Sequence, residues 1–376
     1  MIQTCKRCGL DTRIPNISFN EKGECNFCSL YDIWSAQYDT HKPELLLNVM
    51  NKIKKDGESS KYDCVVGVSG GCDSSYLLYL AKEWGLRPLA VHWDNGWNTD
   101  IAKSNLKKVT DGLNVDLKIL TPDFDEMNDI NKSFLYASVT DVDIPNDIAL
   151  ETVLHKFSEQ HNIKYILNGH SFRTEGMAPL GWTYMDGKYI QSVQKQFGKY
   201  PIKTFPNLWL SKWLSWCVIN RIRHIRPLWY VNYIKADAKQ ILNKQFGWEW
   251  YGGHHKENKY TLFAMYHIYN KFGIDKRLIS NAALVRDGQQ TLEESFEVTC
   301  KPITIPKEIL NEVYNKLYID EEEYKKILTL KNKTYHDYET YSETYKRLKY
   351  LFWVLAKLDL VPMTFYTKYT NGKTKR

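Results

Sequence analysis

The chain has 376 residues, enough for about two domains with a full core, and a formal net charge of +7. This modest positive excess suits anionic ligands such as nucleotides, and it does not by itself indicate a nucleic-acid partner. Because the first residues carry no secretory signal pattern and no apolar run approaches the length of a membrane span, we expect an intracellular protein with reduced thiols, in the cytoplasm or at the inner face of the membrane.

Four cysteines lie close to the amino terminus. Cys5, Cys8, Cys25 and Cys28 form two C-x2-C pairs separated by sixteen residues, a spacing typical of a four-thiolate zinc site. In a reducing compartment such pairs bind metal rather than form disulfides. Zinc is favoured over an iron–sulfur cluster, because clusters more often use other cysteine spacings. We therefore predict a structural zinc knuckle within residues 1–40.

A strand–helix rhythm follows the knuckle. A helix is expected over residues 43–53, and the alternation then begins. The predicted strands cover residues 64–68, 89–93, 115–120 and 164–167, and the predicted helices cover residues 73–84, 99–112 and 147–160. Alternating units of this size predict an α/β domain over residues 41–200, with a parallel, doubly wound sheet and helices on both faces. Residues 201–376 are expected to be mostly helical and to contact substrate or a partner.

The first strand runs into a glycine- and serine-rich loop, residues 69–75. Gly70 and Gly71 let the backbone fold around an anion, and the start of the next helix directs free N–H groups at it. The hydroxyl groups of Ser69, Ser74 and Ser75 add further donors. Asp73 makes sense beside a phosphate mainly if a cation bridges the two. The loop lacks the spacing of a Walker P-loop. It predicts binding of the pyrophosphate end of ATP, with Asp73 on Mg²⁺.

Other polar residues follow later strands, where ligands of parallel sheets bind. His92 and Asp94 end the second strand and are candidates for the nucleotide, although a simple β-turn explains residues 94–96 equally well. Gly169 and His170 end the last strand, and this position favours a ligand role for His170.

Two carboxylates precede the helix at 147–160. Asp141 and Asp143 face the same way if the backbone is extended. They could hold a metal, orient ammonia or act as a base, and solvated loop acids are the alternative. Further along, Arg173 and Glu175 place a cation and an anion at the cleft mouth.

An aromatic stripe lies in the second half of the chain. Trp209, Trp213 and Trp216 share one helical face, and arginines follow at 221, 223 and 226. This pattern suits contact with a membrane surface or a lipid-linked substrate. It also suits a stripe of core residues with a cationic end, which is the favoured interpretation.

Residues 69–74 match the Ser-Gly-Gly-X-Asp-Ser signature of the PP-loop ATP pyrophosphatases residue for residue. Together with the knuckle, four further segments extend the resemblance: residues 140–145, 168–176, 246–257 and 271–277. The combination resembles the bacterial N-acetyl sugar amidotransferases of surface-polysaccharide (lipopolysaccharide O-antigen) and nonulosonic-acid biosynthesis. It covers roughly residues 1–295.

The resemblance implies an AMP-forming carbon–nitrogen ligase. The acetamido group of a sugar or sugar nucleotide becomes an acetamidino group through an adenylated imidate. Ammonia comes from a separate glutamine amidotransferase subunit, and no nucleic-acid partner is expected. The implied cofactors are ATP, Mg²⁺ and Zn²⁺. The catalytic candidates are Asp73, His170, Arg173, Glu175, Asp141 and Asp143, and the substrate-binding candidates are Arg173, Glu175, His254, His255 and Lys276.

Two alternatives remain open at this point. Some tRNA-thiolating PP-loop enzymes carry paired C-x2-C motifs, and the positive charge would suit tRNA. They usually need catalytic cysteines near the cleft, and Cys217 and Cys300 have no such setting. The second alternative is a non-catalytic scaffold for zinc and nucleotide, which would leave the intact Asp73 without a purpose.

Overall fold

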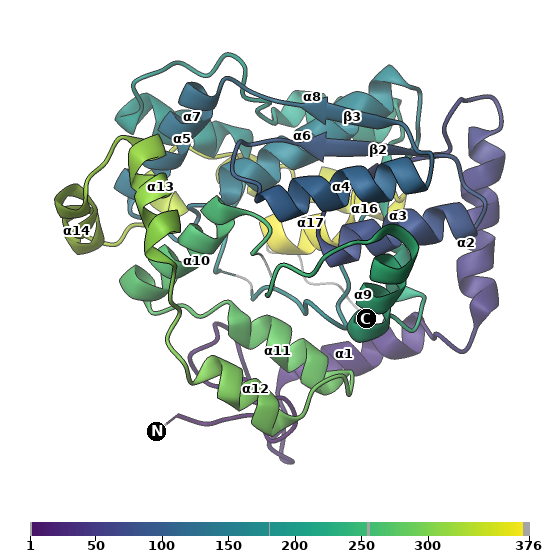
Figure 1. The fold of residues 1–376 in the computed structure, drawn as a ribbon, viewed down its shortest axis with the longest axis horizontal. Coiled ribbons are helices and arrows are strands. Elements are labelled where there is room, and N and C mark those ends of the chain that lie inside the picture. Colours follow the sequence, from purple (N-terminus) through teal and green to yellow (C-terminus); the bar gives the residue numbers. More distant parts are fainter. Residues whose placement is uncertain (1, 180, 254–255, 371–376) are drawn as a thin grey trace.

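The computed structural model describes residues 2–179, 181–253 and 256–370, and it is built around a five-stranded parallel sheet (Figure 1). The strand order is β3-β2-β1-β4-β5. The strands are β1 (Cys64–Gly67), β2 (Pro88–Trp93), β3 (Leu117–Leu120), β4 (Tyr165–Leu167) and β5 (Arg223–Ile225). All four pairings are parallel, with Val65 opposite Leu89 between β1 and β2, and Val65 opposite Ile166 between β1 and β4. The predicted α/β fold class is confirmed.

Helices cover both faces of this sheet and build most of the second half of the chain. In chain order they are α1 (Asn26–Gln37), α2 (Pro43–Gly57), α3 (Cys72–Glu83), α4 (Asp100–Gly112), α5 (Phe124–Ala137), α6 (Ile144–Gln160), α7 (Gly187–Phe197), α8 (Leu210–Leu214), the π-helix η1 (Ser215–Ile219), the 3-10 turn η2 (Pro227–Trp229), α9 (Lys235–Phe246), α10 (Lys259–Phe272), α11 (Arg277–Arg286), α12 (Leu292–Thr299), α13 (Lys307–Leu317), α14 (Glu321–Thr329), the 3-10 turn η3 (Tyr335–Asp337), α15 (Ser342–Arg347), α16 (Lys349–Lys357) and α17 (Met363–Tyr369).

Alternation along the buried strands separates two apolar cores. Val65 and Ile166 pack with α5, α6 and α7 on one face, whereas Val66 and Leu167 pack with α2, α3 and α9 on the other. The central strands β1, β2 and β4 are mostly apolar because both of their faces are covered by helices. Figure 1 shows α9, from the second half of the chain, beside α3.

Strand β5 comes from a region that sequence reasoning treated as helical. Tyr165 of β4 pairs with Arg223, so the sheet takes its fifth strand from beyond residue 200. The three residues Arg-His-Ile of β5 are too few and too polar for a recognisable strand pattern. Sequence reasoning also did not anticipate α1 and α5. The domain division at residues 1–40, 41–200 and 201–376 stays a prediction.

The carboxy-terminal helices form two further groups. Helices α10, α13 and α14 share an apolar core with Trp97 and Leu135. Helices α15, α16 and α17 pack into the other core, the one that contains α5, α6 and α7. The knuckle packs against α11 at the base of the view in Figure 1. Within the described ranges, none of the helices combines the length and the apolar character that crossing a bilayer requires.

The tryptophan stripe is mainly a core feature. Trp213 and Trp216 are buried in the apolar core that contains Val65 and Ile166. Of the three tryptophans, Trp209 alone is exposed, at 38%. The helix that carries them changes from α8 to the π-helix η1 after Leu214. This placement favours the core interpretation of the stripe over contact with a membrane surface.

Candidate active site

The loop between β1 and α3 is a tight turn that only glycine permits at one position. Gly70 has φ +80°, and a Cβ atom there would lie 2.1 Å from the carbonyl oxygen of Ala102 on α4. Two serines close the turn. The Ser69 N–H donates to Ser74 Oγ at 3.2 Å, and the Gly71 N–H donates to Ser69 Oγ at 3.2 Å. The loop therefore holds a compact shape at the start of α3, where helix N–H groups favour an anion.

Asp73, in the first turn of α3, is held by two residues from far along the chain. Its Oδ2 lies 3.1 Å from Lys235 Nζ, and its Oδ1 accepts a hydrogen bond of 2.6 Å from the Tyr233 hydroxyl. Burial alone would raise the pKa of Asp73, but the Lys235 charge and the Tyr233 hydrogen bond keep that pKa below its usual value. Asp73 is thus ionised, as a metal-binding carboxylate must be.

Two more carboxyl groups interact with Asp73. Burial, followed by the negative charge of Asp73, raises the pKa of Glu175 to about 8. Burial likewise raises the pKa of Glu257 to about 7, and among the described residues its Oε2 has no hydrogen-bond partner. Lys235 is the positive charge that offsets them. Three carboxyl groups around one lysine leave an unbalanced set of oxygen donors, and such a set fits a divalent cation such as Mg²⁺.

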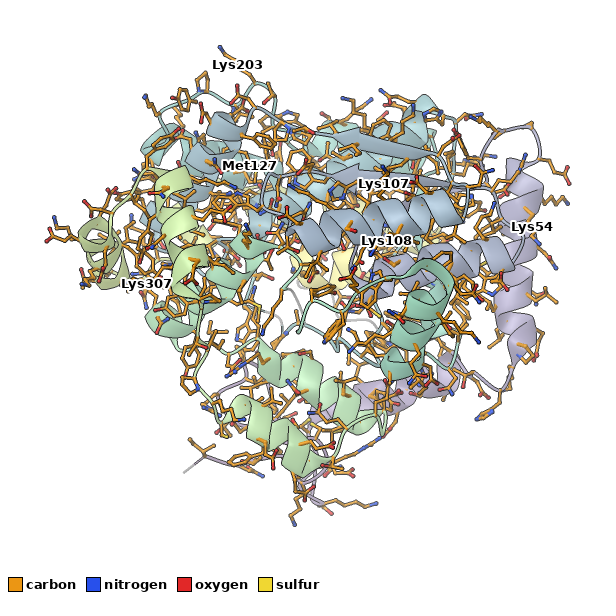
Figure 2. All side chains as sticks on the ribbon, viewed as in Figure 1. Lys54, Lys107, Lys108, Met127, Lys203 and Lys307 are labelled. Carbon is orange, nitrogen blue, oxygen red and sulfur yellow. The ribbon has the colours of Figure 1, made fainter. Side chains whose placement is uncertain are left out.

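Residues 247–251 cover the phosphate loop. The indole N–H of Trp248 donates to the Gly70 carbonyl oxygen at 3.0 Å, and the Tyr251 hydroxyl accepts from the Cys72 N–H at 3.3 Å. On α4, Lys108 (Figure 2) donates to the Gly247 carbonyl oxygen at 2.9 Å and to Glu249 Oε1 at 2.6 Å. The sequence block 246–257 thus meets the loop directly. Its histidines, His254 and His255, lie outside the described residues.

The end of β4 contacts the same helix start. A Cβ atom at Gly169 would lie 3.3 Å from the backbone of Asp73 and of Ser74, so the two segments touch. His170 follows. Its Nε2 lies 3.0 Å from the Gly176 carbonyl oxygen, and its buried Nδ1 has no partner in the described part of the chain. Burial, and then the nearby Arg226, lowers the pKa of His170 to about 4, so the imidazole is neutral.

His92 and Asp94, at the end of β2, make local contacts. His92 Nδ1 lies 2.6 Å from the Val68 carbonyl oxygen, and its Nε2 lies 2.9 Å from Asn98 Nδ2. Both ring nitrogens are therefore engaged between strand ends. Asp94 Oδ1 accepts from the Gly96 N–H at 3.0 Å, which is the turn that the sequence offered as the simpler interpretation. Nucleotide contacts by these side chains stay a prediction.

Arg173 lies in a buried polar cluster that includes its ion-pair partner Asp287. Its Nη1 lies 3.3 Å from Asp287 Oδ1 and 3.3 Å from Ser35 Oγ, and its Nη2 donates to the Tyr38 carbonyl oxygen at 3.2 Å. The guanidinium also lies over the Phe172 ring, 4.7 Å from its centroid. These contacts give Arg173 a positioning role between α1 and the segment after α11. A contact with substrate stays a prediction.

Asp141 and Asp143 line a second, acidic pocket of about 190 Å³ together with Asp147 and Lys276. Burial raises the pKa of Asp141 to about 6 and that of Asp143 above its usual range. Burial, and then the charge of Asp143, raises the pKa of Asp147 to about 7. Sequence reasoning named three of these residues but missed Asp147, whose signal was its i, i+4 spacing from Asp143 on α6.

This pocket is linked to the end of β2. Asn95 Nδ2 donates to Asn146 Oδ1 at 2.8 Å, and Asn146 Nδ2 donates to Asp143 Oδ1 at 2.7 Å. Asn258, next to Glu257, donates to Asn95 Oδ1 at 3.0 Å. A chain of amide contacts therefore runs from the acidic pocket past the strand end to the segment that carries Glu257.

The four amino-terminal cysteines converge at one point. The Sγ–Sγ distances are 3.7 Å for Cys5–Cys28, 3.6 Å for Cys8–Cys25 and 3.7 Å for Cys25–Cys28. Four thiolates about 2.3 Å from a tetrahedral Zn²⁺ lie roughly 3.8 Å apart, so the cysteines fit zinc. Arg286 Nη1 lies 3.4 Å from Cys8 Sγ and would support the thiolate charge. All four are buried, so the site would be closed and structural.

Sequence models of two families match different parts of this chain. The queuosine biosynthesis protein QueC family matches residues 63–177, which contain β1 to β4 and the phosphate loop. The LPS biosynthesis protein WbpG-like, C-terminal domain family matches residues 254–351, which follow the segment over that loop. These matches confirm both parts of the resemblance drawn from the motifs.

Individual relatives are more distant. An uncharacterized protein of Methanocaldococcus jannaschii is 25% identical over 300 residues, which cover 79% of this chain and 92% of that protein. The probable mitochondrial tRNA-specific 2-thiouridylase 1 of Caenorhabditis elegans is 24% identical over 199 residues, which cover 48% of this chain and 50% of that protein.

Among solved structures, the NMN synthetase from Francisella tularensis is similar with a TM-score of 0.33 and 14% identity, covering 77% of this chain and 95% of that one. The NH3-dependent NAD synthetase from Campylobacter jejuni is similar with a TM-score of 0.29 and 14% identity, covering 70% and 97%.

Proposed function

We propose that this chain, which belongs to the PP-loop proteins and carries a WbpG-like C-terminal domain, uses ATP to convert a sugar acetamido group into an acetamidino group. The observation that carries the proposal is the contact between the two parts. The phosphate loop is covered by Trp248 and Tyr251, which immediately precede the WbpG-like domain. The first residues of that domain also meet the loop and the end of β2: Glu257 Oε1 would lie 3.6 Å from a Cβ atom at Gly71, and Asn258 donates to Asn95.

The chemistry explains why ATP would be needed. An amide carbon is a weak electrophile, and its oxygen is a poor leaving group. Attack of the amide oxygen on the α-phosphorus of ATP forms an O-adenylated imidate and releases pyrophosphate. Ammonia then adds to the imidate carbon, a proton is lost, and AMP departs with the former amide oxygen. The product carries nitrogen in place of that oxygen.

The residues at the loop have defined tasks in this scheme. The N–H groups at the start of α3 and the hydroxyls of Ser69 and Ser74 would bind the pyrophosphate. Asp73, aided by Glu175 and Glu257, would hold Mg²⁺, which supplies charge neutralisation at the phosphates. Lys235 would remain beside Asp73 and bring a second positive charge to the leaving pyrophosphate.

The acidic pocket would receive ammonia. Asp147, with a pKa of about 7, and Asp141, with a pKa of about 6, are suited to accept a proton near neutral pH. An ammonium ion would therefore be attracted among the three carboxyl groups, and a carboxylate there would be placed to accept the proton that the nitrogen loses once it has added to the imidate carbon. Release of ammonia from glutamine needs an accessible cysteine nucleophile in a cleft. Cys64, Cys72 and Cys217 are buried and Cys300 is exposed at a helix end, so a separate glutaminase subunit would supply the ammonia.

Thiolation of tRNA is the second candidate, favoured by the likeness to the 2-thiouridylase over 199 residues. Such chemistry needs a reactive thiolate near the nucleotide. Burial raises the pKa of Cys72 to about 12, and the same effect raises the pKa of Cys217 to about 12. Both thiols therefore stay protonated at neutral pH, which favours the sugar reaction.

The test incubates purified protein with ATP, Mg²⁺, ammonium and a panel of nucleotide-activated N-acetyl sugars, with mass spectrometry of the sugars and quantification of AMP. We expect exchange of an amide oxygen for NH with equal release of AMP. Asp73→Asn should lower AMP release about 100-fold or more, because it removes the metal-binding charge.

Asp116→Asn is the matched control. Asp116 is an ionised surface partner of Lys61 away from the loop, and its substitution should leave the rate unchanged. AMP release that depends on tRNA and leaves every sugar intact would replace the sugar proposal with thiolation. ATP binding without cleavage, in the presence of a co-purified glutaminase, would contradict both.

A further inference from the structure

We propose that Glu151, His155 and His224 form a second metal site, distinct from the cysteine knuckle, which binds one Zn²⁺ ion. Glu151 and His155 lie one turn apart on α6, and His224 is the middle residue of the edge strand β5. One ligand atom from each residue lies within 4.8 Å of the other two, and the Glu151 carboxylate oxygen Oε1 lies 3.5 Å from the His155 ring at Nδ1 and 3.0 Å from His224 Nε2. One carboxylate and two imidazoles are a common ligand set for zinc sites with an open fourth position.

The hydrogen bonds of His155 leave one ring nitrogen free for a metal. Its Nδ1 lies 2.9 Å from the backbone carbonyl oxygen of Glu151, which can only accept, so Nδ1 carries the proton. Nε2 therefore bears the lone pair, and it is buried without a hydrogen-bond partner in the described ranges. A metal-binding histidine typically donates its other N–H to a backbone carbonyl in this way. The Trp216 ring stacks on His155 at 5.1 Å and fixes its orientation.

His224 and Glu151 have the spacing of two ligands of one ion. His224 Nε2 lies 3.0 Å from Glu151 Oε1. Yet the contact lacks hydrogen-bond geometry, since this nitrogen is buried and unpartnered within the part of the chain that the structure describes. Two ligand atoms about 2.0–2.1 Å from a tetrahedral zinc ion are roughly 3.3 Å apart. The observed 3.0 Å is close to that separation, so small shifts of the two side chains would let both atoms bind one ion.

The surroundings can tolerate the added charge. Asp147, one turn before Glu151 on α6, contributes negative charge, and Arg226 contributes a positive one. The Glu151 side chain is 26% exposed, which gives an ion and a water molecule a way in. The proposed ion would join α6 to β5 and so fix the edge of the sheet.

The test counts zinc in protein that was loaded with excess Zn²⁺ and then dialysed exhaustively. We expect about two zinc ions per chain, one at each site. His224→Ala should retain about one, and Cys25→Ser should also retain about one. Loading with Co²⁺ separates the sites, because only the knuckle gives intense thiolate-to-metal absorption. His224→Ala should keep those bands and lose the weaker ligand-field bands of a nitrogen and oxygen site.

His336→Ala, at an exposed histidine far along the chain, is the control and should keep both ions. Circular dichroism verifies that each variant is folded. If His224→Ala does not fold, Glu151→Gln, which keeps the side-chain volume, serves in its place. One zinc ion per wild-type chain, or two in folded His224→Ala and in folded Glu151→Gln, would overturn the proposal.

Discussion

Replacement of Gly70 by alanine should disrupt the phosphate loop through two separable effects. The backbone has φ +80° at this position, and alanine in the left-handed region costs roughly 1–2 kcal/mol. The new Cβ would also lie 2.1 Å from the carbonyl oxygen of Ala102. Overpacking of this kind typically costs about 1–3 kcal/mol. The sum is a loss of about 2–5 kcal/mol in the free energy of unfolding.

Relief of this clash by movement is limited on both sides. The N–H of Ala102 is held by the Thr99 side chain at the start of α4, and the Gly70 carbonyl oxygen accepts from Trp248. Displacing the loop would therefore break a further hydrogen bond, worth about 1 kcal/mol. ATP binding should be lost as well, because the N–H groups at the helix start move with the loop.

Gly71→Ala is the matched comparison, since it adds the same methyl group one residue later. Gly71 has φ −72°, which alanine adopts readily, and its Cβ would meet side-chain hydroxyls, that of Ser69 at 3.0 Å and that of Tyr251 at 3.3 Å, so the clash costs at most the hydrogen bonds of these movable groups. Urea unfolding followed by circular dichroism gives both free energies. If Gly70→Ala lies within about 1 kcal/mol of wild type, or if Gly71→Ala costs as much, the steric reasoning is wrong.

Three other predictions concern the knuckle, a buried acid and a buried ion pair. Cys25→Ser should release the knuckle zinc and lower the thermal midpoint, as measured by metal analysis and calorimetry; an unchanged zinc content would contradict the four-thiolate site. The pKa of Glu175 is raised from 4.5 to about 8, so the folded state disfavours its ionised form, and the free energy of unfolding should fall as pH rises from about 4.5 towards 8. Glu175→Gln should reduce this fall, as measured by urea unfolding at a series of pH values. The same pH dependence in wild type and variant would show that the pKa of Glu175 is not raised. Arg173→Met should cost about 3–5 kcal/mol by leaving Asp287 without its cation, yet ATP cleavage per folded molecule should change less than tenfold. A larger loss of cleavage in the folded variant would instead support the predicted substrate contact of Arg173.

Sequence reasoning located the phosphate loop because its signature is local. The glycines, serines and Asp73 sit in seven consecutive residues that run from the end of a strand into the first turn of a helix. The partners of Asp73 were not predictable in the same way. Tyr233 and Lys235 come after β5, about 160 residues beyond Asp73 in the chain. Neither residue type marks a binding site by itself. Only the folded chain brings them to the loop.

Arg173 shows the opposite case, in which nearness in sequence did not reveal the contacts of the side chain. It lies three residues after His170, so the sequence placed both at one cleft. The Arg173 side chain contacts Asp287 and Ser35, two residues that are distant in sequence, and its contact with substrate stays a prediction. His92 was found at a strand end as expected, but its ring contacts Val68 and Asn98. Strand ends were therefore predictable, whereas the direction of each side chain depended on tertiary packing.

The late origin of β5 has a consequence for how this protein can be made or divided. A polypeptide that stopped at residue 200 would lack the strand that pairs with β4, and would leave the backbone of Tyr165 and Ile166 open at a hydrophobic edge. It would also lack Leu242 and Trp248, which complete the core over α3. During synthesis, β4 therefore lacks its partner strand until the chain has been made to at least residue 225. Until then the exposed edge is a surface for chaperones or for self-association, and a soluble nucleotide-binding fragment should need residues to at least 251.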